Sequence, residues 1–120
     1  MTPEKEQLLI TTYPKILKVN AGYMGHGCEL AVGDGWLQIL FDLCAKLQAI
    51  SDITGEQITA TQIKEKFGGL RFYVNSATDE QYALIDAAEV LADKTCEECG
   101  APGIKRNEGW IKTLCDEHAQ

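Results

Sequence analysis

Four residues near the C-terminus have the spacing of a closed metal site. They form a Cys-x-x-Cys pair and a Cys-x-x-His pair with fifteen residues in between: Cys96, Cys99, Cys115 and His118. Zn²⁺ is bound tetrahedrally by thiolate sulfur and imidazole nitrogen, and two ligands three residues apart can reach one ion from a single tight turn. Gly100 directly follows the second cysteine and suits such a turn, because glycine tolerates positive φ angles. The spacing predicts a zinc site.

We expect this zinc to be structural, because four protein ligands leave no position for water or substrate. The alternative is that the cysteines are ordinary buried thiols and that His118 is an unrelated tail residue. Five cysteines in 120 residues is an odd number, and only Cys28 and Cys44 lie outside the motif. A disulfide framework is therefore not expected, and the composition favours a reducing compartment.

The net charge of −7 argues against broad binding to a nucleic-acid backbone, since proteins of that class usually carry a basic face. It fits a cytosolic protein, or one that presents acid to a basic partner. Residues 1–7 are polar with no apolar run behind them, so we expect no signal peptide. No apolar stretch approaches the length of a membrane span. We therefore expect a cytoplasmic protein without a membrane partner.

The chain should form an α+β core over residues 1–95 and a zinc-binding lobe over residues 96–120. In the core, two or three helices should pack on a β-hairpin, and the lobe should be ribbon-like. A first helix should start with Thr2 as N-cap and end before Pro14, and residues 13–19 should form a short strand or a linker.

Apolar residues at intervals of three and four predict a helix over residues 36–50, with Asp34 at its N-cap or first turn and Ser51 at its end. Thr78 and Gln81 have the spacing of a capping box for another helix. Within the lobe, residues 110–114 are predicted to form a short strand that returns to Cys115.

Two runs rich in β-branched and aromatic residues flank Gly68 and Gly69 and predict a hairpin. With these two glycines as the loop, Glu65 would lie opposite Phe72 on the apolar face. A buried carboxylate there would have a raised pKa and could serve in acid–base chemistry. A three-residue loop would instead place Glu65 opposite Arg71.

The polar face of this hairpin holds the candidate partner- or anion-binding residues: Lys64, Lys66, Arg71 and Tyr73. Like charges across strands cost stability unless something neutralises them, so the face predicts a site for phosphate, a carboxylate or an acidic protein patch. The alternative is that acids of the following helix form ordinary salt bridges with it: Asp79, Glu80 or Asp86.

His26 and Cys28 lie in a glycine-rich loop over residues 21–35 and are candidates for a second metal or a nucleophile pair. No local signature of a cysteine protease surrounds them. The chain also lacks a P-loop, a dinucleotide fingerprint and a His-Glu-x-x-His motif. We expect no enzyme, and the weaker alternative is a hydrolase that uses His26 or Glu65.

Three segments carry a resemblance: Gly33-Asp34-Gly35-Trp36, the hairpin over residues 64–73, and the C-terminal Cys/His motif. Together they resemble a family of small, mostly uncharacterised proteins encoded by bacteriophages and prophages. Relatives often have a cysteine before the Gly-Asp-Gly-Trp motif, where this chain has Val32. The resemblance implies a phage protein that acts in the bacterial host cytoplasm, without an activity to carry over.

Two functional hypotheses follow. The first is a non-enzymatic interaction protein whose partner is a bacterial protein or protein complex; by analogy with other small acidic phage proteins, it would inhibit a host defence complex. The second is a nucleic-acid or nucleotide binding module, in which Lys64, Lys66, Arg71 and Tyr73 meet phosphate and base.

Overall fold

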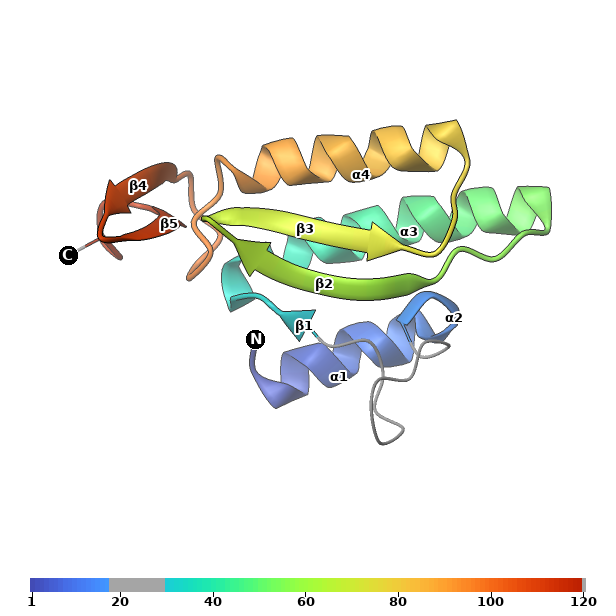
Figure 1. Cartoon of the computed structure of the whole chain (residues 1–120). Helices are drawn as coiled ribbons and strands as arrows, with labels where there is room; N and C mark the ends of the chain where they lie inside the picture. The colour runs from blue at the N-terminus through green and yellow to red at the C-terminus, as the bar shows by residue number, and fades with distance from the viewer. Residues whose placement is uncertain (18–29, 120) are drawn as a thin grey trace.

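The computed structural model describes residues 1–17 and 30–119 and has the expected α+β architecture (Figure 1). Its helices are α1 (Pro3–Thr12), α2 (Pro14–Leu17), α3 (Leu37–Thr54) and α4 (Asp79–Ala92). One sheet has the strand order β1-β2-β3, and β4 and β5 form a separate hairpin. None of the helices in these residues is long and apolar enough to cross a membrane.

Helix α1 begins as predicted, with the Thr2 side chain accepting a hydrogen bond from the Lys5 backbone N–H. The prediction of a strand or linker after Tyr13 is wrong for the residues that the structure describes. Pro14 starts the short helix α2 instead, since proline suits a first helical position. Ile16 and Leu17 are fully buried, so packing against the core holds this turn in place.

The apolar stripe of α3 is confirmed, and Leu40, Leu43 and Leu47 are buried along it. The helix continues past Ser51 and ends at Gly55, whose φ of 80° is the left-handed conformation of a C-cap glycine. Asp34 does not cap α3. It lies in a 3-10 turn, η2 (Asp34–Trp36), that precedes the helix. The capping box of α4 is confirmed.

Strands β2 (Ala60–Lys66) and β3 (Gly69–Val74) form the predicted hairpin, but both expected registers are wrong. The two-residue loop is Phe67 and Gly68, with φ angles of 53° and 80°. Positive φ at both positions is the requirement of the type I′ turn that matches the twist of the strands. Glu65 therefore lies opposite Leu70.

The predicted hairpin is extended to a three-stranded sheet by β1 (Leu30–Ala31), which pairs with β2 in parallel. Helices α3 and α4 lie along the sheet, and α1 lies beside β1 (Figure 1). Fully buried side chains fill the space between the elements: Trp36, Leu40, Leu47, Ile63 and Leu70.

The lobe is a hairpin of β4 (Ile104–Glu108) and β5 (Trp110–Leu114), joined at Gly109. Strand β5 was predicted, whereas β4 was not. Most of β4 is polar and exposed, so it lacks the apolar alternation that marks a strand in a sequence. Figure 1 shows this hairpin beyond the turn of β2 and β3, at one end of the molecule.

Candidate metal centre

The structure brings the four predicted ligands together. The ligand atoms of Cys96, Cys99, Cys115 and His118 all lie within 4.8 Å of one another. Cys99 Sγ is 3.8 Å from Cys115 Sγ, and Cys96 Sγ is 3.7 Å from His118 Nδ1. Sulfurs bound at about 2.3 Å to one tetrahedral ion are about 3.8 Å apart, whereas a disulfide needs about 2.05 Å. The cluster could therefore hold a metal ion.

Each ligand pair comes from a short turn at one end of the β4–β5 hairpin. Gly100 has a φ of 83°, as predicted for a tight turn after the second cysteine. The Gly100 N–H donates to Cys96 O at 2.9 Å, and the Cys96 N–H donates to Ala101 O at 2.7 Å. These two backbone hydrogen bonds hold residues 96–101 in a tight turn, so the thiols of Cys96 and Cys99 lie close to the other two residues of the cluster.

At two of the three cysteines, the turns also favour the thiolate that a metal needs. Burial raises the pKa of Cys96, but hydrogen bonds from the backbone amides of Cys115, Cys99 and Glu98 outweigh it and lower this pKa to about 6. The backbone amide of His118, and then the His118 side chain, lower the pKa of Cys115. The Cys115 side chain in turn raises the pKa of His118. The backbone amide of Ala101 lowers the pKa of Cys99, but burial and the thiols of Cys115 and Cys96 outweigh it and raise this pKa. The fold therefore favours the thiolate at Cys96 and Cys115 but not at Cys99.

The Gly-Asp-Gly-Trp motif, residues 33–36, packs directly against the turn formed by residues 96–100, which we call the metal turn. The Gly35 N–H donates to Glu97 O at 2.7 Å. A Cβ on Gly35 would overlap the Cys96 carbonyl oxygen and lie 2.6 Å from Gly100 N. A Cβ on Gly33 would overlap the Glu97 carbonyl oxygen. Both glycines are required because the backbone of the metal turn passes directly against them.

The other two residues of this motif, Asp34 and Trp36, form hydrogen bonds that connect it to the N-terminus of α1 and to the end of the α4 segment. Trp36 is fully buried, and its indole Nε1 donates to Thr95 O at 2.9 Å. Asp34 accepts from the Thr2 N–H at 2.9 Å and pairs with Lys5 at 3.1 Å. These bonds, the Thr2 one first, lower the pKa of the Asp34 carboxyl. One motif therefore connects α1, α3 and the metal turn.

Glu97 is a site residue that sequence reasoning missed. Its side chain is only 7% exposed, and Oε2 accepts from the Gly33 N–H at 2.9 Å. Its backbone N–H donates to Thr113 O at 3.0 Å. Burial raises the pKa of this carboxyl, although the Gly33 bond opposes the shift. This burial has no sequence signal, because the Gly33 N–H that binds the carboxylate lies 64 residues away in the chain.

A buried side-chain hydrogen bond joins the lobe to the core hairpin. Thr113 is fully buried in β5, and its hydroxyl donates to Gly68 O at 2.7 Å. A Cβ on Gly68 would lie 3.2 Å from the Ile111 side chain. The turn of the β2–β3 hairpin therefore rests directly on β5.

The four candidate anion-binding residues share one face of the β2–β3 hairpin. Lys64 lies directly opposite Arg71, and Lys66 and Tyr73 flank them on the same side. Within residues 1–17 and 30–119, no carboxylate lies within 4.0 Å of Lys64, Lys66 or Arg71. The expected salt bridges to Asp79, Glu80 or Asp86 do not form there. We call Lys64, Lys66 and Arg71 the basic face.

Glu65 has a structural role in the described fold. Its Oε2 accepts from the Gly68 N–H at 2.7 Å, which stabilises the turn after it. The carboxylate lies at a half-buried position on the sheet face opposite the basic face. His26 and Cys28, the candidate second metal or nucleophile pair, lie outside the described residues.

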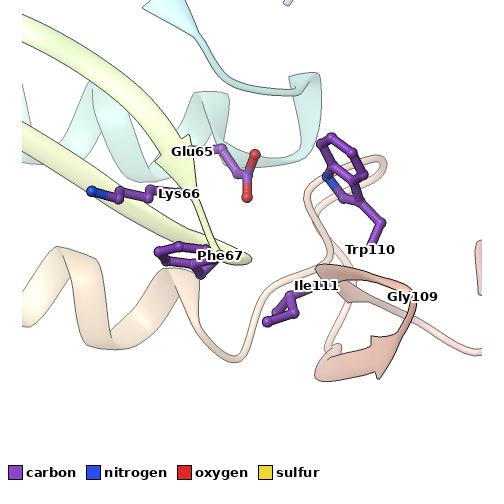
Figure 2. Close-up of a pocket in the computed structure, with 6 residues that line it drawn as sticks. All are labelled: Glu65, Lys66, Phe67, Gly109, Trp110 and Ile111. Atoms are coloured by element: carbon purple, nitrogen blue, oxygen red, sulfur yellow. The ribbon is translucent and has the colours of Figure 1, made fainter.

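A groove of about 390 Å³ lies between the β2–β3 hairpin and the β4–β5 hairpin of the lobe. Figure 2 shows Phe67 and Trp110 on either side of it, with Ile111 below and the Glu65 carboxylate between them. Phe67 is 64% exposed and Trp110 is 77% exposed. We call Phe67, Trp110 and Ile111 the apolar groove.

Comparison of the chain with protein-family models, with curated proteins and with solved structures found no match.

Proposed function

We propose that this protein is a non-enzymatic zinc protein that acts by binding another protein. In this proposal, Cys96, Cys99, Cys115 and His118 hold a structural Zn²⁺. The observation that carries it is the set of four protein ligands within 4.8 Å, because a saturated tetrahedron leaves no open position for catalysis. Three thiolates and one imidazole are ligands that zinc binds well.

The proposed role of the metal is to hold the β4–β5 hairpin in place beside the core. The lobe buries few of its own residues: Thr113 is the one fully buried side chain in its described strands. A hairpin of two strands is at best marginally stable in water. Metal binding therefore contributes much of the free energy that folds this lobe.

The zinc proposal is tested by metal analysis and by chelation. Purified protein should contain one zinc per chain, and a strong chelator should unfold the lobe while the core remains helical. Amide hydrogen exchange in β4 and β5 reports on the lobe, and circular dichroism reports on the helices of the core. Cys99→Ser should reproduce the effect of the chelator, and Cys44→Ala, an apolar substitution of a cysteine outside the cluster, serves as the control. Metal-free protein with an unchanged lobe would contradict the proposal.

We further propose that the partner is a bacterial protein or protein complex in the host cytoplasm. The support is the resemblance of the Gly-Asp-Gly-Trp, hairpin and Cys/His segments to phage and prophage proteins. Inhibition of a host defence complex is the form of this activity that we propose. Affinity capture from bacterial lysate, with nuclease treatment, should recover a stoichiometric protein only with zinc-loaded protein. Capture of nucleic acid alone would contradict it.

The second candidate function is nucleic-acid or nucleotide binding. The observation in its favour is that Lys64, Lys66 and Arg71 lack a carboxylate partner among the described residues, with Tyr73 exposed beside them. It predicts an oligonucleotide complex whose affinity falls steeply with salt and is lost in Lys66→Ala/Arg71→Ala.

A further inference from the structure

We infer that the apolar groove and the basic face together form one docking surface for an acidic protein segment that carries a large apolar side chain. This inference rests on the proposed protein-binding function and names its site and the chemistry of the partner. The apolar side chain would enter the groove, and flanking carboxylates would meet the basic face.

The two patches are continuous across the tip of the β2–β3 hairpin. Phe67 forms one wall of the groove, and the ammonium of Lys66 lies 5.7 Å from the centre of its ring. Figure 2 shows the Lys66 side chain extending away from Trp110, so it marks the border between the groove and the basic face. A segment that crosses Phe67 would meet both patches within a few residues.

The apolar groove has the character of an interaction site. Its volume of about 390 Å³ is within the range of about 300–1,000 Å³ that is typical of ligand pockets. Tryptophan and aromatic side chains are enriched among the residues that dominate binding energy at protein interfaces. Two such side chains stand on separate hairpins, and the contact between Thr113 and Gly68 fixes their relative position.

The conformation of Phe67 also sets this residue apart. Its φ of 53° is rare for a bulky residue, and the first position of such a turn usually holds asparagine, aspartate or glycine. Burial in the core does not offset this strain, because the ring is 64% exposed. Strained, exposed positions of this kind are found at binding sites more often than elsewhere.

The charges favour an acidic partner. Lys64 and Arg71 are direct cross-strand neighbours, and such a like-charge pair is destabilising until an anion lies between them. Asp93 pairs with Lys105 at 3.1 Å; its carboxylate and the Arg71 guanidinium both lie beside Gly69, but they form no ion pair with each other. Carboxylates of a partner would neutralise the basic face and would remove this repulsion.

The same observations favour a protein segment over nucleic acid. The Glu65 carboxylate lies inside the groove and would repel any anion there, so the carboxylates of the partner must lie outside the groove on the basic face, while Glu65 could accept a hydrogen bond from a peptide N–H. The chain as a whole carries a net charge of −7, which opposes the approach of a long polyanion. A short acidic segment needs only the local basic face.

The test uses a randomised peptide library selected against the full zinc-loaded chain. Enriched peptides should share a large apolar residue flanked by Asp or Glu. They should bind at least about tenfold more weakly to Trp110→Ala and to Phe67→Asn, since truncation of a dominant interface residue costs at least this much. Phe67→Asn keeps a residue that the turn accepts, so folding is preserved. Ile53→Ala and Lys46→Ala, exposed positions on α3, should bind like the wild type.

Several outcomes would overturn the inference: no enrichment, enriched peptides without acidic residues, or equal binding by the groove variants. Tighter binding of a single-stranded oligothymidine at the same salt would overturn it in favour of nucleic acid. The proposed function is tested separately by capture from lysate. A protein partner that is recovered equally by the wild type and by Trp110→Ala would leave the proposed function standing and would refute this docking surface.

Discussion

Gly35→Ala tests whether the metal turn and the core form one cooperative unit. The new methyl group would overlap the Cys96 carbonyl oxygen and lie 2.6 Å from Gly100 N. Both are backbone atoms, so a side-chain rotation cannot relieve the clash. Overpacking of this kind costs about 1–3 kcal/mol. Displacement of the turn would also break the 2.7 Å bond from the Gly35 N–H to Glu97 O, worth about 1 kcal/mol. We expect a loss of roughly 2–4 kcal/mol in the free energy of unfolding.

The measurement is urea unfolding, followed by the fluorescence of Trp36 and Trp110, with zinc bound and after chelation. The loss should be larger with zinc bound, because the metal orders the turn against which the methyl group would press. Gly55→Ala is the matched control: its φ is 80° and no atom lies within 4 Å of an added Cβ.

This control should lose about 1–2 kcal/mol from backbone conformation alone, equally in both metal states. A Gly35→Ala protein within 0.5 kcal/mol of the wild type, or one equally destabilised with and without zinc, would refute the coupling.

Two further variants probe contacts of the same region. Thr113→Val removes the buried hydroxyl that donates to Gly68 O, and it should lower the free energy of unfolding in urea by about 1–3 kcal/mol. Thr61→Val, at an exposed position of β2, is the control and should change this free energy little. Equal effects of the two variants would refute the role of the Thr113 bond. Asp34→Asn should lower stability at neutral pH. Because the bonds from Thr2 and Lys5 lower the pKa of Asp34, its contribution is present above the usual carboxyl pKa near 4 and is lost as pH falls through the lower folded value. The melting temperatures of the two proteins should therefore converge in acid, and a constant difference down to pH 2 would contradict this assignment.

The sequence predicted the elements whose signals are local. Capping residues and apolar periodicity located α1, α3 and α4, since these helices are set by contacts within a few positions of the chain. The clustering of Cys96, Cys99, Cys115 and His118, which could hold a metal ion, was also predicted, because two short spacings restrict the geometry of the backbone between each pair. The α+β class followed from the same local patterns.

The register of the hairpin was not predictable from the glycine pair alone. Both Gly68 and Gly69 suit a turn, and a shift by one residue exchanges the opposing partners. The structure places Phe67 in the turn and keeps Gly69 in β3, where a Cβ would lie 2.9 Å from Arg71 Nη1. The nearest atom belongs to the flexible end of the Arg71 side chain, and the nearest backbone atom, Lys66 O, would be 3.6 Å away, so neither turn conformation nor backbone contact requires glycine at position 69.

The sequence by itself determined which side chains can bind a metal and which segments become helices. Only the tertiary structure decided that the Gly-Asp-Gly-Trp motif packs against the metal turn, that the Glu97 side chain is buried against Gly33, and that Phe67 and Trp110 face one groove. Helix caps and ligand spacings act over a few residues. Contacts such as that between Gly33 and Glu97 join positions 64 residues apart, and they depend on how the whole chain packs.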